Sequence, residues 1–547
     1  MAQSPSAVAG TAGSAPPDQT GSYLSHDQII RVLVGVLAGV FLAALDQSIV
    51  GTALPRITSE LGGLNHLAWV VTAYLLTSTA STPLWGKISD LYGRRLIFQI
   101  SIGLFIAGSM LCGLAQNMPE LIIFRAIQGI GGGGLFSLGL AIIGDIVPPR
   151  ERGRYSGYFA ATFGVSSVAG PLLGGFLTDG PGWRWIFYVN VPIGLLAVYI
   201  TSRNLNMPRI RREAKVDYLG AAMVVASVTS LLLYLNWAGN RYGWTSWQGL
   251  ALVAAAIVVG VAFVLVELRV SEPIIPMRLF RNSIFTLGNI FSTVAGVAMF
   301  GALIFLPVYF QTVKGMSATE SGLAMVPAVL GILLTSIGAG ILITRTGRYK
   351  IFPIVGAALI LVALALLTTI GVDTPYWRIG LYMLVFGSGL GCTMQTITTA
   401  IQNSVDIRDM GAATSSNTFF RTLGGAVGTA IFGAILSNRL ASYLRDELAA
   451  NPQASDPAAT GGVAINTNNV QAIRALPEPL RGFVLKAFPY AIDDVFLWGI
   501  PFVLVALVVA FFLKEIPLKS AQTTGPAPAV ESGDVARSGP PRVAPGD

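Results

Sequence analysis

The chain has 547 residues, of which 53% are hydrophobic and only 11% are charged, whereas an ordinary soluble domain has about 25% charged residues. The apolar residues form long runs separated by short charged segments, which excludes a soluble enzyme, a secreted disulfide scaffold and a disordered chain. The net charge of +8 sets orientation in a membrane protein, so we predict no nucleic-acid partner.

Residues 1–27 contain no Lys or Arg and lack the basic region of a signal peptide, so we expect a flexible cytoplasmic tail. A helix that crosses about 30 Å of hydrocarbon needs roughly 20 mostly apolar residues. Six such runs within residues 28–204 predict an N-terminal six-helix bundle. The runs are Ile29–Leu54, His66–Trp85, Leu96–Ala115, Pro119–Ile143, Tyr155–Leu177 and Ile186–Ser202.

Residues 205–282 form a predicted linker that contains two inserted spans, and residues 283–517 hold a second six-helix bundle. The inserted spans are Tyr218–Asn236 and Trp247–Leu268, and those of the second bundle are Ile284–Phe310, Ser321–Ile343, Ile351–Gly371, Tyr376–Ile401, Met410–Leu436 and Val495–Leu513. The predicted fold is therefore an all-α membrane protein with 14 transmembrane helices. We also expect an external loop at 437–490 and a flexible cytoplasmic tail at 518–547.

Most of the 35 Lys and Arg residues fall in the tails and in the loops on one side of the predicted membrane. Short loops rich in Lys and Arg remain in the cytoplasm. We therefore predict a plasma (inner) membrane protein with both termini in the cytoplasm.

Two sets of glycine-containing positions repeat between the bundles and indicate parallel halves. Gly129, Gly131, Gly133 and Gly153 recur 258 positions later as Gly387, Gly389, Gly391 and Gly411. Gly86, Gly93 and Arg94 recur 254 positions later as Gly340, Gly347 and Arg348. Parallel repeats place a binding site near the membrane midplane between the halves, which rock around it. This is the architecture of a secondary transporter.

Nucleotide, metal and catalytic sites are not expected. The Gly129–Gly134 segment resembles a dinucleotide fingerprint but lies in an apolar run without a preceding strand, and Gly86-Lys87 lacks the first glycine of a phosphate loop. The two cysteines and two histidines lack metal or redox spacing. Because no nucleophile has a histidine inside the membrane to activate it, we predict no enzyme activity and no cofactor.

Two ionisable residues at membrane depth are the candidates for ion coupling. Asp46 lies eight residues before Leu54, and Arg125 lies six residues after Pro119, so both sit roughly 9 to 12 Å below the external surface. They can meet if the first and fourth spans adjoin. Asp46 would then take up a proton outside and lose it inside, with Arg125 as the counter-charge. The alternative is a static salt bridge, which would still cost desolvation.

Other polar residues within spans are candidates for the substrate site. Arg421 lies eleven residues past Met410 and either contacts an anionic substrate group or packs against backbone carbonyls; both interpretations stay open. The remaining predicted lining residues are Gln128, Asn289, Gln395 and Asn417.

The fifth span contains several small residues and a proline, which predict a bent helix in a tight seam. The proline removes one helical hydrogen bond, and glycines permit close helix approach. These residues are Gly164, Gly170, Pro171, Gly174 and Gly175.

These segments resemble the major facilitator superfamily, specifically the 14-span drug:proton antiporters of the EmrB/QacA type, over roughly Ile29–Leu518. The segments that carry the resemblance are Leu45–Val50, Gly86–Arg95, Arg125–Gly129 and Gly164–Gly175.

The resemblance implies three roles for residues of this chain. Asp46 and Arg125 couple protons to substrate, and the glycines and proline of the fifth span accompany antiport. A cytoplasmic gate between the halves is formed by Gly86, Asp90, Gly93, Arg94 and Arg95.

The leading functional hypothesis is a proton-coupled antiporter that exports lipophilic cationic or neutral drug-like compounds by alternating access. Its partners would be a small lipophilic substrate, protons and the lipid bilayer, and we expect a monomer. One alternative is a dedicated exporter of an endogenous lipid or metabolite. An alternative of a different class is a membrane receptor or scaffold that does not transport.

Overall fold

The structure is a computed structural model that describes residues 26–61, 67–147, 152–205, 217–237, 243–271, 273–406, 409–450 and 480–518. The predicted tails lie outside the described residues, except for positions 26, 27 and 518. Within the described residues all regular secondary structure is helical and no strand is present. This confirms the predicted all-α fold class.

The helices of the first half correspond to the six predicted spans and the two inserted spans. They are α1 (His26–Leu61), α2 (Leu67–Tyr92), α3 (Arg94–Leu114), α4 (Met118–Ile146), α5 (Arg152–Asp179), α6 (Trp185–Tyr188), α7 (Asn190–Asn204), α8 (Tyr218–Trp237) and α9 (Trp247–Glu267). The predicted sixth span is confirmed as one apolar span, Trp185–Asn204, in which α6 and α7 are separated by Val189 alone. Eleven helical segments of the described chain are long and apolar enough to cross a membrane.

The second half follows a short 3₁₀ helix, η2 (Met277–Arg281). Its helices are α10 (Ser283–Thr312), α11 (Ala318–Ala324), α12 (Val326–Thr346), α13 (Ile351–Leu367), α14 (Tyr376–Ser404), α15 (Met410–Ala450) and α18 (Leu480–Phe512). The predicted tenth span is one apolar span, Thr319–Thr346, in which α11 ends before α12 because Pro327 lies in the first turn of α12 and cannot continue the hydrogen bonds of α11. Helix α13 has only 17 residues, α2 contains many Ser and Thr residues, and α14 contains several Thr and Gln residues.

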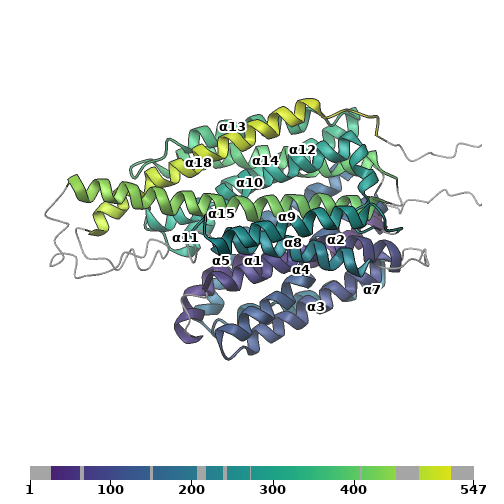
Figure 1. Ribbon diagram of the computed structural model, residues 1–547, viewed down its shortest axis with the longest axis horizontal. Coiled ribbons are helices and arrows are strands. Elements are labelled where there is room, and N and C mark those ends of the chain that lie inside the picture. The colour runs from purple at the N-terminus through teal and green to yellow at the C-terminus, as the bar shows by residue number, and fades with distance from the viewer. Residues whose placement is uncertain are drawn as a thin grey trace, which may run out of the picture.

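The helices form two bundles, each with its own apolar core (Figure 1). The first bundle, α1–α7, buries Phe98 and Phe105 of α3 against Leu135 of α4. In the second bundle, α10–α18, Tyr309 and Phe310 pack in the same way near one end. The two bundles lie side by side along their length.

The repeated glycines occupy equivalent helix contacts in the two bundles. A Cβ on Gly129 or Gly133 of α4 would collide with the backbone of α2, and one on Gly131 with the backbone of α3. In the second bundle Gly387 and Gly391 of α14 contact α12, and Gly389 contacts α13. Small residues permit such close helix approach. Glycines two residues apart lie on different faces of α4 and of α14, so each of these helices packs closely on two neighbouring helices. This explains why the two-residue spacing of the glycines occurs in both bundles.

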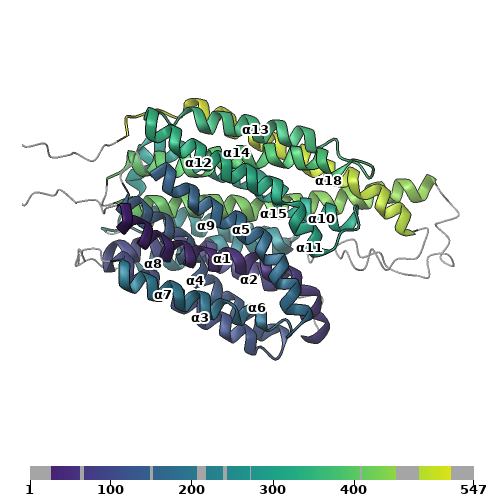
Figure 2. The ribbon, with the colours of Figure 1, turned by 180° about the vertical axis from the view of Figure 1, so that it is seen from behind.

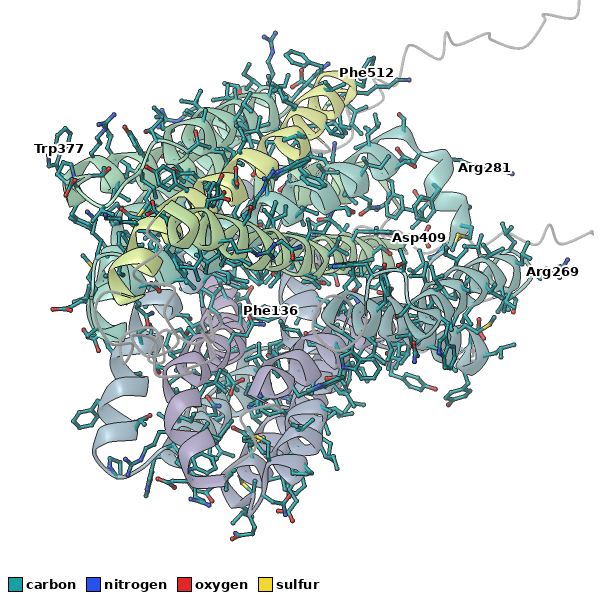
Figure 3. The ribbon with its side chains drawn as sticks, turned by 60° about the vertical axis from the view of Figure 1, so that its left-hand side comes forward. Phe136, Arg269, Arg281, Trp377, Asp409 and Phe512 are labelled. Carbon is teal, nitrogen blue, oxygen red and sulfur yellow. The ribbon has the colours of Figure 1, made fainter. Side chains whose placement is uncertain are left out.

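The ends of the helices define two ends of the molecule. At the terminal end, α1 begins near the end of α7, since Gly35 contacts Thr201, and α18 ends beside the start of α13, where Tyr349 donates a hydrogen bond to Lys514 O over 3.1 Å. Figure 3 places Trp377, at the start of α14, on the opposite side, the far end, from Asp409 before α15. Both described chain ends therefore lie at the terminal end.

Two seams join the bundles. In the first, α5 runs along α12, and in the second, α2 runs along α15 (Figures 1 and 2). The inserted pair α8 and α9 packs on the second seam, because Val224 and Val228 of α8 share an apolar cluster with Ala80 of α2 and Phe419 of α15. The insertion therefore covers one flank of the interface between the bundles.

Helices extend into both ends of the segment predicted as an external loop, residues 437–490. Helix α15 continues to Ala450 and α18 already begins at Leu480, so the pair projects beyond the far end of the bundles (Figure 1). Arg439 and Asp494 form an ion pair of 3.2 Å across this projection. The centre of the predicted loop, residues 451–479, lies outside the described residues.

Candidate functional site

The Asp46 carboxylate lies at the centre of the first bundle and is completely buried. Arg125 NH1 lies 2.6 Å from Asp46 Oδ2, while Gln128 Nε2 and Asn190 Nδ2 donate to Asp46 Oδ1 over 2.8 and 3.0 Å. Helices α4 and α7 thus supply three donors to one carboxylate of α1. Burying a charge is tolerated only with such partners. The predicted meeting of spans one and four occurs here.

The Arg125 guanidinium is held by several groups besides Asp46. It donates through NH1 to Gln128 Oε1 over 2.8 Å and through Nε to Val70 O over 3.2 Å. Its Cζ lies 4.4 Å from the centre of the Tyr74 ring, a cation–π contact. Helix α2 therefore also contacts the charged pair. Because α2 belongs to the second seam, a movement of Arg125 would change the contacts of a helix in that seam.

Two of these partners differ from the predictions. Gln128 was predicted to line the substrate site, but its amide joins Asp46 and Arg125 inside the first bundle. Asn190 was not predicted as a site residue, although its position at the start of α7 places a short amide beside Asp46. Its amide nitrogen also donates to Ser109 Oγ over 3.0 Å.

Asn190→Ala is expected to lower the midpoint temperature of thermal unfolding. The substitution removes a hydrogen bond to a charged group, worth about 1.5–3 kcal/mol. Asn204→Ala is the matched control on the same helix, because Asn204 donates to the neutral Ile200 carbonyl over 3.0 Å, a bond worth about 0.5–1.5 kcal/mol. Equal shifts for the two variants would contradict this account of Asn190.

The predicted gate residues meet the second bundle at the terminal end. Arg94 NH2 lies 2.6 Å from Asp90 Oδ1, and Arg94 Nε lies 2.6 Å from Asp145 Oδ2 at the end of α4. Asp90 Oδ2 accepts a hydrogen bond of 3.1 Å from Ala412 N in the first turn of α15. A carboxylate at a helix N-terminus is stabilised by the free backbone donors and the helix dipole. This contact closes the second seam.

Gly93 and Gly86 of the gate have different structural roles, one in a turn and one in a helix contact. Gly93 has φ = 96° at the junction of α2 and α3, and Gly347 has φ = 71° at the equivalent end of α12; both angles favour glycine. Gly86 contacts the Ser415 side chain of α15. Arg95 donates to Ser202 O over 2.6 Å within its own bundle, so this bond does not join the halves as predicted.

The pKa of Asp90, which lies past the end of the predicted span at Trp85, is raised from its ordinary value to about 6 by burial. Arg94 and Lys87 lower the pKa, and Asp145 raises it further. The closed gate therefore binds a proton more tightly than an open, hydrated gate with an ordinary carboxyl. By linkage, acidification through this range stabilises the closed gate.

Acidification from pH 7.5 to 5.5 is accordingly expected to increase the population closed at the terminal end. Spin labels on Tyr92→Cys and Thr346→Cys, exposed at the ends of α2 and α12, would report it as a shift towards shorter distances in double electron–electron resonance. The native cysteines are buried and should label poorly. Asp90→Asn should remove the dependence; a pH response that persists in this variant would assign it to another group.

The five residues predicted from the fifth span face two different partners. Gly170 and Gly174 pack on Ser48 and Thr52 of α1, whereas Gly164, Pro171 and Gly175 face α11 and α12. Ser48 Oγ also donates to Ser166 O over 2.8 Å. Helix α5 therefore joins the helix that carries Asp46 to the first seam.

Comparison with known proteins agrees with this geometry. The sequence model of the Major Facilitator Superfamily matches residues 36–429. The chain belongs to the major facilitator superfamily. Among solved structures of this superfamily, it resembles the proton:xylose symporter XylE with a TM-score of 0.60 and 15% identity, over 91% of this chain and 98% of that one, a likeness that supports the fold.

Curated relatives in the superfamily extend over almost the whole chain. The chain is 38% identical to the multidrug transporter protein MdtP of Bacillus subtilis, over 89% of this chain and 94% of the relative. It is 35% identical to multidrug resistance protein 3 of the same organism, over 90% and 97%. It is therefore a multi-pass membrane transporter with multidrug efflux relatives, and the superfamily comprises transporters rather than enzymes.

The other predicted substrate residues of this superfamily member lie in the second bundle. Asn417 Nδ2 donates to Ser292 Oγ over 2.7 Å and to Asn289 Oδ1 over 3.3 Å. Gln395 of α14 is also buried. Thr398, three residues further along the same helix, donates to Asn417 Oδ1 over 3.2 Å. Arg421, one turn beyond Asn417, lines a small cavity between α10, α14 and α15.

Proposed function

We propose that this chain is a proton-coupled antiporter that exports lipophilic compounds from the cytoplasm by alternating access. The observation that carries the proposal is the buried Asp46 carboxylate, held by Arg125, Gln128 and Asn190 inside the first bundle. An ionisable group at membrane depth is costly and is usually functional. One proton that moves inward across 100 mV supplies about 2.3 kcal/mol.

Protonation of Asp46 would weaken its attraction to Arg125 and change the packing of α1. Because Ser48 of α1 donates to Ser166 O and packs on Gly170, the change would reach α5. Helix α5 forms the first seam with α12, where Gly164 contacts Val329. The two bundles would then rock about the interface and expose the space between them to alternate sides.

The remaining parts of the proposal concern orientation and substrate. We assign the terminal end, with the Asp90 gate, to the cytoplasm of the plasma membrane, because Lys and Arg are concentrated in the loops predicted at that end. Relatives named for multidrug transport and multidrug resistance support small lipophilic substrates. The protein would act as a monomer.

The test is ethidium transport by purified protein in proteoliposomes with an imposed pH gradient. The expected result is ethidium accumulation that requires the gradient, together with proton counterflow reported by the dye pyranine. Ethidium movement that ignores the gradient, without proton movement, would rule out antiport.

Export of a dedicated lipid or metabolite is the second candidate, favoured by the projecting part of α15 and α18. A cavity of about 280 Å³ lies on this projection, lined by Tyr443, Asp446, Glu447, Ala487 and Tyr490. Such a surface could receive a large amphipathic molecule as it leaves. Deletion of residues 451–479 would separate the candidates, since a drug exporter should retain ethidium transport and a dedicated exporter should lose export of its substrate.

A further inference from the structure

Arg421 is a buried charge without a protein partner in the described chain. Its side chain is only 9% exposed, yet among the described residues the guanidinium forms no ion pair and no hydrogen bond, including to a carbonyl. Arg125, the comparable arginine of the first bundle, has a carboxylate, an amide and a carbonyl. The predicted alternative, packing against backbone carbonyls, therefore lacks the hydrogen bonds that would stabilise it.

Arg421 lines a cavity of about 20 Å³, which in this closed arrangement has room for about one water molecule. Its polar wall consists of Arg421, Ser292 and Thr393, three side chains from α15, α10 and α14. The rest is apolar and includes Phe291, Ala295, Met299, Leu390, Met394 and Ile397. Methionine side chains adapt to ligands of different shape.

The polar side of this cavity continues along one turn of helix. Ser292 Oγ accepts from Asn417 Nδ2, and Asn417 lies one turn before Arg421 on α15. Asn289 Nδ2, one turn before Ser292 on α10, is buried without a partner among the described residues. The cavity wall itself therefore contains one cation and two hydroxyl groups and no described carboxylate, and the two amides lie beside Ser292.

We propose that Arg421 binds the anionic group of an amphipathic substrate, a lipophilic carboxylate or sulfonate, whose apolar part occupies the wall formed by Phe291, Met299 and Met394. The inference rests on the proposed function, because it names the substrate class of the same transporter. A planar guanidinium binds a carboxylate through two parallel hydrogen bonds. The energetic cost of an unpaired arginine at membrane depth is then offset when the substrate binds.

The test compares two fluorescent probes, 1-pyrenebutyrate and its neutral analogue 1-pyrenebutanol, in equilibrium binding to the purified full-length protein. Wild type is expected to bind pyrenebutyrate at least tenfold more tightly. Arg421→Gln should remove this preference while changing pyrenebutanol affinity less than threefold, and Arg421→Lys should retain part of it. Arg378→Gln is the matched control, because it removes an exposed charge in the first turn of α14, at the far end of the molecule. This variant should leave both affinities unchanged.

Equal binding of the two probes by wild type, binding of neither, or equal loss of both in Arg421→Gln would overturn the inference. Because equilibrium binding needs no proton gradient, these outcomes are independent of the transport experiment, in which ethidium movement without proton counterflow would instead remove the antiport proposal. Displacement of pyrenebutyrate by dihexanoyl phosphatidylglycerol, without transport of pyrenebutyrate into proteoliposomes, would assign the cavity to a lipid headgroup and overturn it as a substrate site.

Discussion

Asp46→Asn is expected to lower gradient-driven ethidium transport to below about one hundredth of the wild-type rate, since the variant loses the buried carboxylate that would exchange the proton. The asparagine is nearly isosteric and can still accept from Gln128 and Asn190, whose nitrogens lie 2.8 and 3.0 Å from Asp46 Oδ1. The measurement is ethidium accumulation with simultaneous pyranine fluorescence in proteoliposomes. Downhill ethidium movement is expected to lose its dependence on pH.

The control for this experiment is a second buried carboxylate. Glu267 of α9 is 2% exposed and accepts hydrogen bonds from Ile274 N and Ile275 N, over 3.2 and 3.3 Å. Glu267→Gln should leave coupled transport near the wild-type rate. Asp46→Asn leaves Arg125 without its counter-charge, and loss of one partner of a buried ion pair can destabilise a protein by about 3–5 kcal/mol, so thermal unfolding must accompany the assay. A folded Asp46→Asn protein with normal proton counterflow would refute the coupling role.

Gly411→Ala should open the gate and slow turnover about tenfold or more. A Cβ on Gly411 would collide with Asp90 Oδ1 and with the Arg94 guanidinium, and overpacking of this kind costs typically about 1–3 kcal/mol. Because every 1.4 kcal/mol or so changes an equilibrium tenfold, the closed population at the terminal end should fall sharply. The distance between spin labels at positions 92 and 346 should lengthen.

Gly433→Ala provides the matched control for the gate variant. Gly433 lies on the same helix, α15, but an added Cβ there would meet nothing within 4 Å. This variant should keep the wild-type distance distribution and turnover. If Gly411→Ala also keeps them, the contact between Asp90 and the start of α15 does not control closure.

The sequence allowed prediction of the helices because hydrophobic runs of membrane length are strong local signals. It also predicted the Asp46 and Arg125 pair, since the depth of each residue follows from its distance to the end of its own run. The length of α15 was missed because the residues after Leu436 continue as a polar helix. Hydropathy marks the end of an apolar run, which need not be the end of the helix.

Contacts that depend on how helices pack could not be predicted in this way. Asp145 lies 51 positions from Arg94 in the chain, yet the two form an ion pair because α3 and α4 are adjacent. Asn190 lies 144 positions from Asp46 in the chain, yet its amide donates to the carboxylate because α1 and α7 are adjacent. The sequence shows that Gln128 is a polar residue within a span. Whether its side chain faces a substrate cavity or the Asp46–Arg125 pair depends on how α4 is rotated about its axis, which the sequence does not give.

Because α8 packs over α2 and α15, the two flanks of the transporter expose different parts of the interface between the bundles to the lipid. On the flank of the second seam, apolar side chains of the inserted pair occupy the place that acyl chains would otherwise take. On the flank of α5 and α12, the described residues include no inserted pair of helices, and the short helix α11 contacts both α5 and α12. A compound dissolved in the bilayer would therefore enter between the bundles from one flank, and the insertion would give lipid access a direction.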